Sequence, residues 1–416
     1  GQDLVNIDVD IALTGTGPQV IEIDDTRTGT FQSEASITGS GDLTKDGTGT
    51  LILASASTYN GETRIVRGTL ALGAADALPT GTLLVVDSSN ASETATFDLA
   101  GFDQEVGGIS RDDAGTGGSV ITNSAAGTNT LTVDAATASS YNGVIEDSIA
   151  LTKTGTATFT LSGPNTYTGA TLVSAGQLTV GSDTALGGTA AGTTVTNNAQ
   201  LELTDGVTVT GESVTINGNG SDFNGALRTE ENGDATWDGN VILGSTARIG
   251  TENNAILRID GVIQNGGGSS LLVNAGADAS GTVVLSGANT YTGQTQVIRG
   301  TLQLGADDTL PNGTALVLDS SGASEDVALD LNGFDQTIAS LSRNDAGTGA
   351  STITNSDAGF NTLTVNQSGN TTYSGVIEDT VNLVKDGAGN LTLTGINTYI
   401  GTTAINGGTL TVNGEI

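Results

Sequence analysis

The side chains that could carry chemistry in this chain are three lysines, nine arginines and 46 carboxylates. The chain has no histidine and no cysteine, which excludes imidazole bases, thiolate nucleophiles and Ser-His-Asp or Cys-His triads. A lyase needs a base, for which the three lysines are the first candidates. A glycosidase would need two carboxyls about 5–10 Å apart in a cleft.

The lysines recur in a repeated motif. Lys45, Lys153 and Lys385 occupy the same position of that motif, and Asn274 occupies it in a further copy. A catalytic base is normally unique, whereas an architectural residue recurs. We interpret the lysines as structural: the stem covers apolar surface and the ammonium pairs with the neighbouring Asp46 or Asp386. Asn274 indicates that the charge is dispensable. The alternative is a lyase base.

The arginines fall into a recurrent set and a single set. Arg67 with Arg299, and Arg111 with Arg343, recur 232 residues apart. The single set is Arg27, Arg64, Arg228, Arg248 and Arg258. The last three share a singly represented block with Phe223 and Trp237, and a guanidinium beside an aromatic ring can bind an acidic glycan through stacking and bidentate pairing. The alternative is a set of surface counter-charges in an acidic protein.

Adjacent carboxylates are frequent, as expected by chance in so acidic a chain. They include Asp24-Asp25, Asp112-Asp113, Glu146-Asp147, Glu230-Glu231 and Asp307-Asp308. No EF-hand loop and no nonapeptide calcium repeat accompanies them. We interpret each pair as solvated charge and expect weak, diffuse calcium binding by the surface rather than one tight site.

Four tyrosines stand in a T-Y-x-G motif: Tyr59, Tyr167, Tyr291 and Tyr399. A row of aromatic rings suggests a sugar-binding ladder. Their place before a glycine favours anchors that pack a turn, which is our interpretation.

Composition excludes several partner classes. A net charge of −34 and a pI near 4.1 repel nucleic acid and anionic lipid. The longest apolar runs, such as Leu83–Val86, are far below the roughly 18 residues of a spanning helix, so we expect no membrane insertion of this segment. The glycines Gly266–Gly268 lack the Gly-Lys-Ser/Thr of a phosphate loop.

The local hydrophobic period is two. Runs such as Leu51–Leu53, Leu70–Leu72 and Leu131–Val133 alternate apolar with small or polar residues between Gly, Asn and Asp, which is typical of short strands joined by tight turns. The 62 glycines disfavour helices. Because such strands are unstable alone, stacking of successive coils is favoured. We predict an all-β, right-handed parallel β-helix (β-solenoid) of elongated shape. The alternative is a pair of antiparallel sandwiches.

The chain also repeats at a larger scale. Residues 74–142 and 306–374 align without a gap at about 60 % identity, and Tyr59 and Tyr291 stand 232 residues apart. We therefore divide the chain into a first solenoid copy, 1–232, and a second, shortened copy, 233–416, within one continuous rod. An uncapped end of the shortened copy would favour end-to-end stacking.

The repeated motifs resemble a known family. The run from Leu383 to Leu410, with Lys385-Asp-Gly387 and Thr398-Tyr399-Ile-Gly401, resembles the autotransporter-associated β-strand repeat, and four copies match across roughly 37–413. The resemblance implies a parallel β-helix and a secreted passenger or large surface protein of a Gram-negative-type bacterium. It defines no catalytic site, so no functional residue is carried over from it.

The resulting hypothesis is a non-enzymatic extracellular or cell-surface protein: an adhesive shaft, or a self-associating filament subunit of the kind found in a biofilm matrix. We assign no catalytic, cofactor-binding or metal residues and expect no cofactor beyond weak surface calcium. The expected partners are further copies of the chain, end to end or laterally, and cell-surface glycans. The alternatives are a polysaccharide-active β-helix enzyme (lyase or glycosidase) and a glycan- or ice-type binding module. Any export signal is expected outside this sequence.

Overall fold

The computed structural model describes residues 4–7, 10–15, 17–24, 30–33, 36–88, 92–112, 117–274, 280–319, 325–343 and 349–416. Contacts within the chain define two compact units, unit 1 (Gly1–Thr194) and unit 2 (Val195–Ile416). The two units are defined by contacts in space, whereas the predicted boundary at residue 232 is defined by sequence repetition. The boundary at residue 232 therefore stays a prediction. No helix among the described residues has the length and apolar character needed to cross a membrane.

Short strands make up both units. Those of unit 1 are β1 (Leu4–Ile7), β2 (Ile11–Leu13), β3 (Pro18–Glu22), β4 (Thr30–Ser33), β5 (Ile37–Gly39), β6 (Asp42–Asp46), β7 (Thr50–Leu53), β8 (Thr63–Ile65), β9 (Gly68–Leu72), β10 (Leu83–Val86), β11 (Thr94–Asp98), β12 (Gln104–Val106), β13 (Gly108–Ser110), β14 (Gly118–Thr122), β15 (Asn129–Asp134), β16 (Ser139–Tyr141), β17 (Val144–Ile145), β18 (Ile149–Thr154), β19 (Thr158–Leu161), β20 (Thr171–Val173) and β21 (Gln177–Val180). Strand β22 (Thr193–Val195) contains the division between the units.

Unit 2 comprises β23 (Gln200–Leu203), β24 (Thr208–Val209), β25 (Val214–Gly218), the 3-10 helix η1 (Ser221–Phe223), β26 (Leu227–Thr229), β27 (Asp234–Trp237), β28 (Val241–Thr251), β29 (Ile256–Ile259), β30 (Ile263–Asn265), β31 (Leu271–Val273), β32 (Thr282–Leu285), β33 (Thr295–Val297), β34 (Gly300–Leu304), β35 (Ala315–Leu318), β36 (Val327–Asp330), β37 (Gln336–Ile338), β38 (Ser340–Ser342), β39 (Ser351–Thr354), β40 (Asn361–Asn366), β41 (Thr371–Tyr373), β42 (Val376–Ile377), β43 (Val381–Asp386), β44 (Asn390–Leu393), β45 (Thr403–Ile405) and β46 (Thr409–Val412).

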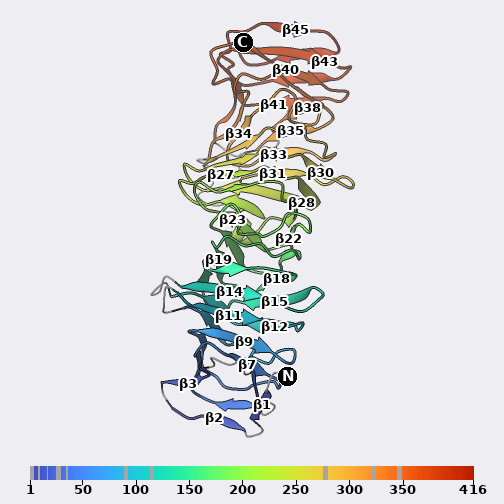
Figure 1. Cartoon of the computed structure of the whole chain (residues 1–416). Helices are drawn as coiled ribbons and strands as arrows, with labels where there is room; N and C mark the ends of the chain where they lie inside the picture. Colours follow the sequence, from blue (N-terminus) through green and yellow to red (C-terminus); the bar gives the residue numbers. More distant parts are fainter. Residues whose placement is uncertain are drawn as a thin grey trace. The chain divides into compact units, whose positions relative to one another are not determined.

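Successive coils pair in parallel, in register. In unit 1 one sheet runs β1-β4-β7-β9-β11-β14-β17 and another β13-β10-β8-β6-β3; Figure 1 shows β7, β9, β11 and β14 lying one beyond the next. In unit 2 the longest separate sheet runs β24-β27-β29-β32-β34-β36-β39-β42. The pairs β7–β9 and β34–β36 illustrate the parallel register. Parallel pairing of strands from successive coils defines a β-solenoid.

Apolar side chains form columns inside each unit, because alternate residues of a strand point inward. In unit 1 one column consists of Leu51, Leu70, Phe97, Ile121 and Ile145, all fully buried. In unit 2 the matching kind of column consists of Leu257, Val283, Leu302, Leu329, Ile353 and Ile377, also fully buried. The parallel β-solenoid is confirmed, and the antiparallel sandwich is wrong.

Close stacking explains one of the repeated glycines. A Cβ atom on Gly163 would lie 1.7 Å from the carbonyl oxygen of Gly143 in the preceding coil, and one on Gly395 would lie 1.9 Å from that of Gly375. Only a residue without a side chain fits there. The glycine two residues after β19 and after β44 therefore sets how closely coils approach.

Candidate functional site

The lysines lie inside the solenoid. Lys45 on β6 is fully buried, and its Nζ donates hydrogen bonds to the carbonyl oxygens of Asp46 (2.9 Å), Gly47 (2.8 Å) and Arg67 (3.1 Å). Asp46 ends β6, Gly47 begins the turn after it, and Arg67 precedes Gly68 in the next coil. The ammonium therefore ties two successive turns together.

Lys153 and Lys385 repeat this arrangement. Lys153 donates to the carbonyls of Thr154, Gly155 (3.0 Å) and Ala175 (3.2 Å), and Lys385 donates to those of Asp386 (2.5 Å), Gly387 (3.0 Å) and Gly407 (3.2 Å). Burial lowers the pKa of Lys45 and Lys153 to about 8 and lowers the pKa of Lys385 in the same direction. All three ammonium groups are enclosed by carbonyls.

The expected pairing of the lysines with aspartate is wrong. The Asp46 carboxylate instead accepts a hydrogen bond from Arg67 Nε at 2.6 Å, which lowers the pKa of Asp46. The reason is geometric: Lys45 points inward on its strand, so the carbonyls at the turn are its nearest acceptors, while the Asp46 side chain points outward.

The position assigned to Asn274 also needs correction. By strand register, Leu43-Thr44-Lys45 corresponds to Leu271-Leu272-Val273, because Lys45 pairs with Ile65 and Val273 with Val297. Val273 thus takes the lysine position. Asn274 follows it with a φ of +48° and is fully buried; its amide accepts from the Thr251 N–H (2.7 Å) and donates to the Gly281 carbonyl (3.1 Å). The Asn274 side chain therefore turns into the interior and satisfies buried backbone groups there.

The motif tyrosines pack turns. Tyr59, Tyr167 and Tyr291 are buried, and their hydroxyls bond the threonine four residues later at 2.5, 2.6 and 2.5 Å. Tyr399 makes the same bond to Thr403 at 2.6 Å and is half-buried. Rings enclosed in this way form no exposed ladder for a sugar.

The recurrent arginines make repeated local bonds. Arg111 and Arg343 donate from Nη2 to the carbonyls of Gly117 (2.9 Å) and Gly349 (2.8 Å). Arg67 contacts Glu93 at 3.7 Å in addition to Asp46, and Arg299 pairs with Glu325. Equivalent arginines therefore hold equivalent loops.

Four of the adjacent carboxylates bond the backbone or a hydroxyl of a neighbouring coil. Asp307 accepts from the Asp335 N–H and Asp308 from the Thr337 N–H, both at 2.8 Å; Glu230 accepts from the Asp205 N–H at 2.8 Å and Asp147 from Thr122. Asp25, Asp113 and Arg27 lie outside the described residues. Three or more acidic side chains are nowhere grouped as a metal site in the part of the chain that the structure describes. Weak calcium binding by the surface stays a prediction.

The singly represented block of unit 2 separates into paired and unpaired arginines. Arg228 contacts Glu202 at 2.5 Å and also Glu252, and Arg258 contacts Asp234 at 3.2 Å. Trp237 is fully buried and belongs to the core. Arg248 lies 5.9 Å from the centre of the Phe223 ring. Of the three arginines and two aromatic residues predicted to act together in this block, the structure thus brings Arg248 and Phe223 together.

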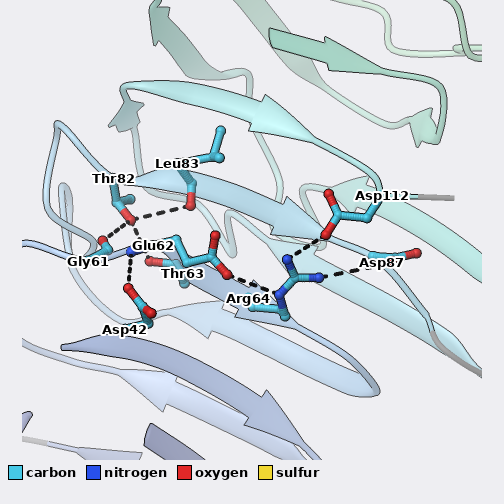
Figure 2. Close-up of polar contacts among 9 residues, drawn as sticks. All are labelled: Asp42, Gly61, Glu62, Thr63, Arg64, Thr82, Leu83, Asp87 and Asp112. Atoms are coloured by element: carbon cyan, nitrogen blue, oxygen red, sulfur yellow. Dashed lines mark hydrogen bonds and ion pairs between the residues drawn. The ribbon is translucent and has the colours of Figure 1, made fainter. Parts of the chain in front are cut away.

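An ion-pair cluster surrounds Arg64 on the outer face of unit 1 (Figure 2). Arg64 Nε lies 3.1 Å from Glu62 Oε1, Nη2 2.5 Å from Asp112 Oδ2, and Nη1 4.0 Å from Asp87 Oδ2. Strand β8 presents Arg64, while Asp87 follows β10 and Asp112 follows β13. One guanidinium therefore links the outer surface of three successive coils.

The backbone beneath this cluster is fixed by short polar bonds. Thr82 Oγ1 bonds the Gly61 carbonyl (3.0 Å) and Thr63 Oγ1 (2.9 Å), and the Asp42 carboxylate accepts from the Glu62 N–H at 3.0 Å (Figure 2). These bonds position β8 and β10, and so orient the charged groups above them.

Beside the cluster lies an acidic groove of about 600 Å³, lined in part by Glu105, Asp112, Asp134 and the 38 % exposed Leu83. The pKa of Glu105 is raised by burial and by repulsion from Asp134 and Asp76. The sequence prediction missed Arg64 as the centre of a cluster and missed Glu105 and Asp134. A usable signal was present: these positions change in charge between the two otherwise similar copies.

Comparison with known proteins identifies a repeat family and a similar adhesin. The family model for the passenger-associated-transport-repeat matches residues 43–72, 151–180, 280–304 and 383–412. The chain is 34 % identical over 395 residues to "Adhesin BmaC autotransporter" of Brucella suis biovar 1 (strain 1330), with 92 % of this chain and 10 % of that protein covered. The chain spans about a tenth of the length of that relative. No solved structure matches.

The four matched segments each carry the glycine turns and the paired strands described above, and three of them carry the enclosed lysine. The third match, 280–304, begins after the position where Val273 and Asn274 replace it. The chain therefore carries four copies of the passenger-associated-transport-repeat.

Proposed function

We propose that this chain is a non-enzymatic, adhesive segment of an extracellular passenger at the surface of a Gram-negative-type bacterium. The observation that carries the proposal is the enclosure of Lys45, Lys153 and Lys385 by backbone carbonyls. In a chain without His or Cys these lysines were the first candidates for a base, and here they stabilise turns. What the fold presents to its surroundings is a set of differing outer surfaces.

The similarity to an adhesin supports the same proposal. The test is to coat beads with the full chain and count the beads retained on cultured epithelial cells and on extracellular matrix. We expect retention several-fold above that of beads coated with a non-adhesive protein of similar net charge. Equal retention would contradict an adhesive role.

The enzyme alternative has its own measurement. Incubation of the chain with a panel of acidic and neutral polysaccharides is expected to release no new reducing ends and no unsaturated uronates. Cleavage proportional to protein concentration, and abolished by Lys45→Met, would replace the adhesive proposal by a lyase.

Self-association is the finer part of the proposal. It is supported by repetition: the same coil geometry recurs within one chain, so two copies can meet through several weak contacts at once. Sedimentation velocity over a wide range of concentrations, with and without calcium, and electron micrographs are expected to show concentration-dependent oligomers or filaments. Monomers alone under every condition would rule this part out.

A further inference from the structure

The outer face of unit 2 contains a buried cation without a counter-charge. Arg248 on β28 is 6 % exposed, and its Nη1 donates to the carbonyl oxygen of Phe223 at 2.7 Å. Its Nε is buried without a hydrogen-bond partner. No carboxylate among the described residues forms an ion pair with it, although the chain carries 46 carboxylates.

Arg228 provides the internal reference. It is buried to the same extent, 6 % exposed, and it lies between Glu202 and Glu252. Burial of a charge is costly unless an opposite charge or sufficient hydrogen bonds compensate for it. Burial alone lowers the pKa of Arg248 to about 10, with no carboxylate raising it. The Nε of Arg228 likewise lacks a hydrogen-bond partner, so what distinguishes Arg248 among the described residues is the absence of a paired carboxylate. Arg248 remains a cation at neutral pH.

Phe223 is the second element of this surface. It is 63 % exposed, and its ring centre lies 5.9 Å from Arg248 Cζ. Asp222 and Phe223 both have left-handed backbone conformations, with φ of +51° and +63°, which non-glycine residues seldom adopt. The loop thus holds an apolar ring in solvent, directly beside the buried guanidinium.

We propose that Arg248 and Phe223 form a binding site for a carboxylated sugar, that is, for a uronate unit of an acidic glycan. The guanidinium is a planar fork that matches a carboxylate bidentately. The exposed phenyl ring buries the apolar C–H face of a sugar. A uronate carries its carboxylate directly on the sugar ring, which suits two adjacent recognition groups. The ligand carboxylate takes over the bond that Arg248 now donates to the Phe223 carbonyl.

This inference names a partner class for the proposed adhesive function, but binding of a soluble probe is measured independently of adhesion. The probe is a tetragalacturonate, and the matched ligand is its methyl ester, which keeps the sugar and lacks the charge. Isothermal titration of the full chain is expected to show binding of the free acid and at least tenfold weaker binding of the ester.

Three variants assign the site. Arg248→Gln is expected to weaken binding at least tenfold, and Phe223→Ala, which changes an exposed side chain, about threefold to tenfold. The control is Arg258→Gln, a change in the same block at an arginine that pairs with Asp234; it is expected to alter the dissociation constant less than twofold. Circular dichroism checks that each variant is folded.

The outcomes are distinct. Absence of binding at millimolar tetragalacturonate, equal binding of acid and ester, or unchanged binding by both Arg248→Gln and Phe223→Ala would overturn the site. Beads that adhere to cells equally well with wild type and Arg248→Gln would leave the adhesive function in place while removing this site from it.

Discussion

The two copies of the repeat present the same stretch of outer surface with different charge. In the first copy it carries Glu62, Arg64, Glu105, Asp112 and Asp134; the positions 232 residues later are Gln294, Gln296, Thr337, Asn344 and Asn366. Asn344 lies outside the described residues. All five charged side chains of the first copy are thus neutral in the second.

Two polar contacts in the interior of the same coils are duplicated. Gln104 bonds the backbone of Leu78 at 3.0 and 3.1 Å, and Gln336 bonds that of Leu310 at 2.9 and 3.0 Å. The pairs Thr63–Thr82 and Thr295–Thr314 lie at 2.9 and 3.1 Å. The fold therefore depends on its inward polar groups, while the outward positions are free to differ and so to distinguish one surface from another.

The largest loss of stability is expected where a buried ion pair is broken. This comparison separates side chains that the fold requires from side chains whose removal the fold tolerates. Arg228→Gln leaves the buried Glu202 carboxylate without its cation, and we expect a loss of about 3 kcal/mol. Arg248→Gln removes a cation without a carboxylate partner and is expected to change stability by less than about 1 kcal/mol. Denaturant midpoints of the two variants measure this; equal losses would contradict it.

The next effect compares equivalent interior positions. Gln104→Leu and Gln336→Leu each leave buried backbone groups of the preceding coil unsatisfied, at a cost of about 2–3 kcal/mol. Because the two environments match, we expect the two losses to agree within about 0.5 kcal/mol. A loss confined to one variant, in the same unfolding experiment, would show that the copies are not equivalent inside.

A smaller effect is expected on the outer face. Arg64→Gln gives the first copy the residue that the second copy has at the equivalent position, Gln296. We expect it to lower the free energy of unfolding by about 1 kcal/mol or less, because the cluster is partly exposed. The cost should shrink as salt is raised, since screening weakens exposed pairs. The reciprocal Gln296→Arg places a guanidinium near Asp319, which Gln296 already bonds at 3.2 Å, and is expected to be nearly neutral. Thermal unfolding at low and high salt decides between these outcomes.

The smallest effect depends on pH. The pKa of Glu105 is raised above its ordinary 4.5, so the folded state favours the protonated acid. That contribution is fully present below pH 4.5 and is lost as the pH rises through the folded pKa. Glu105→Thr is therefore expected to raise the melting temperature slightly at neutral pH relative to its effect at about pH 4. Thr337→Glu is the reciprocal control. A change in melting temperature on Glu105→Thr that is the same at both pH values would contradict the raised pKa of Glu105.

Much of the fold was predictable because it is periodic. The alternation in runs such as Leu51–Leu53 and the recurrence of Lys45, Lys153 and Lys385 predicted stacked parallel coils with structural lysines, and four matching segments support that prediction. Stacking repeats one local rule, so a short sequence motif is enough to specify each coil.

The bonding partners were less predictable. Sequence neighbours suggested Asp46 as the partner of Lys45, whereas the lysine faces inward and meets carbonyls of two coils. The spacing around Asn274 differs from that of the other copies, so only strand register placed Val273 in the lysine position. Spacing along the chain does not report which way a side chain turns at the end of a strand.

By itself the sequence determined the solenoid, its repeat and the absence of imidazole and thiol chemistry, because these follow from residue identity and period. Only the tertiary structure decided which arginines are neutralised: Arg228 and Arg258 meet carboxylates from neighbouring coils, and Arg248 meets a phenyl ring. The physical reason is that these partners, 24 to 26 residues apart in sequence, become adjacent only when coils stack. The register of the stacked strands then decides which carboxylate lies opposite which arginine.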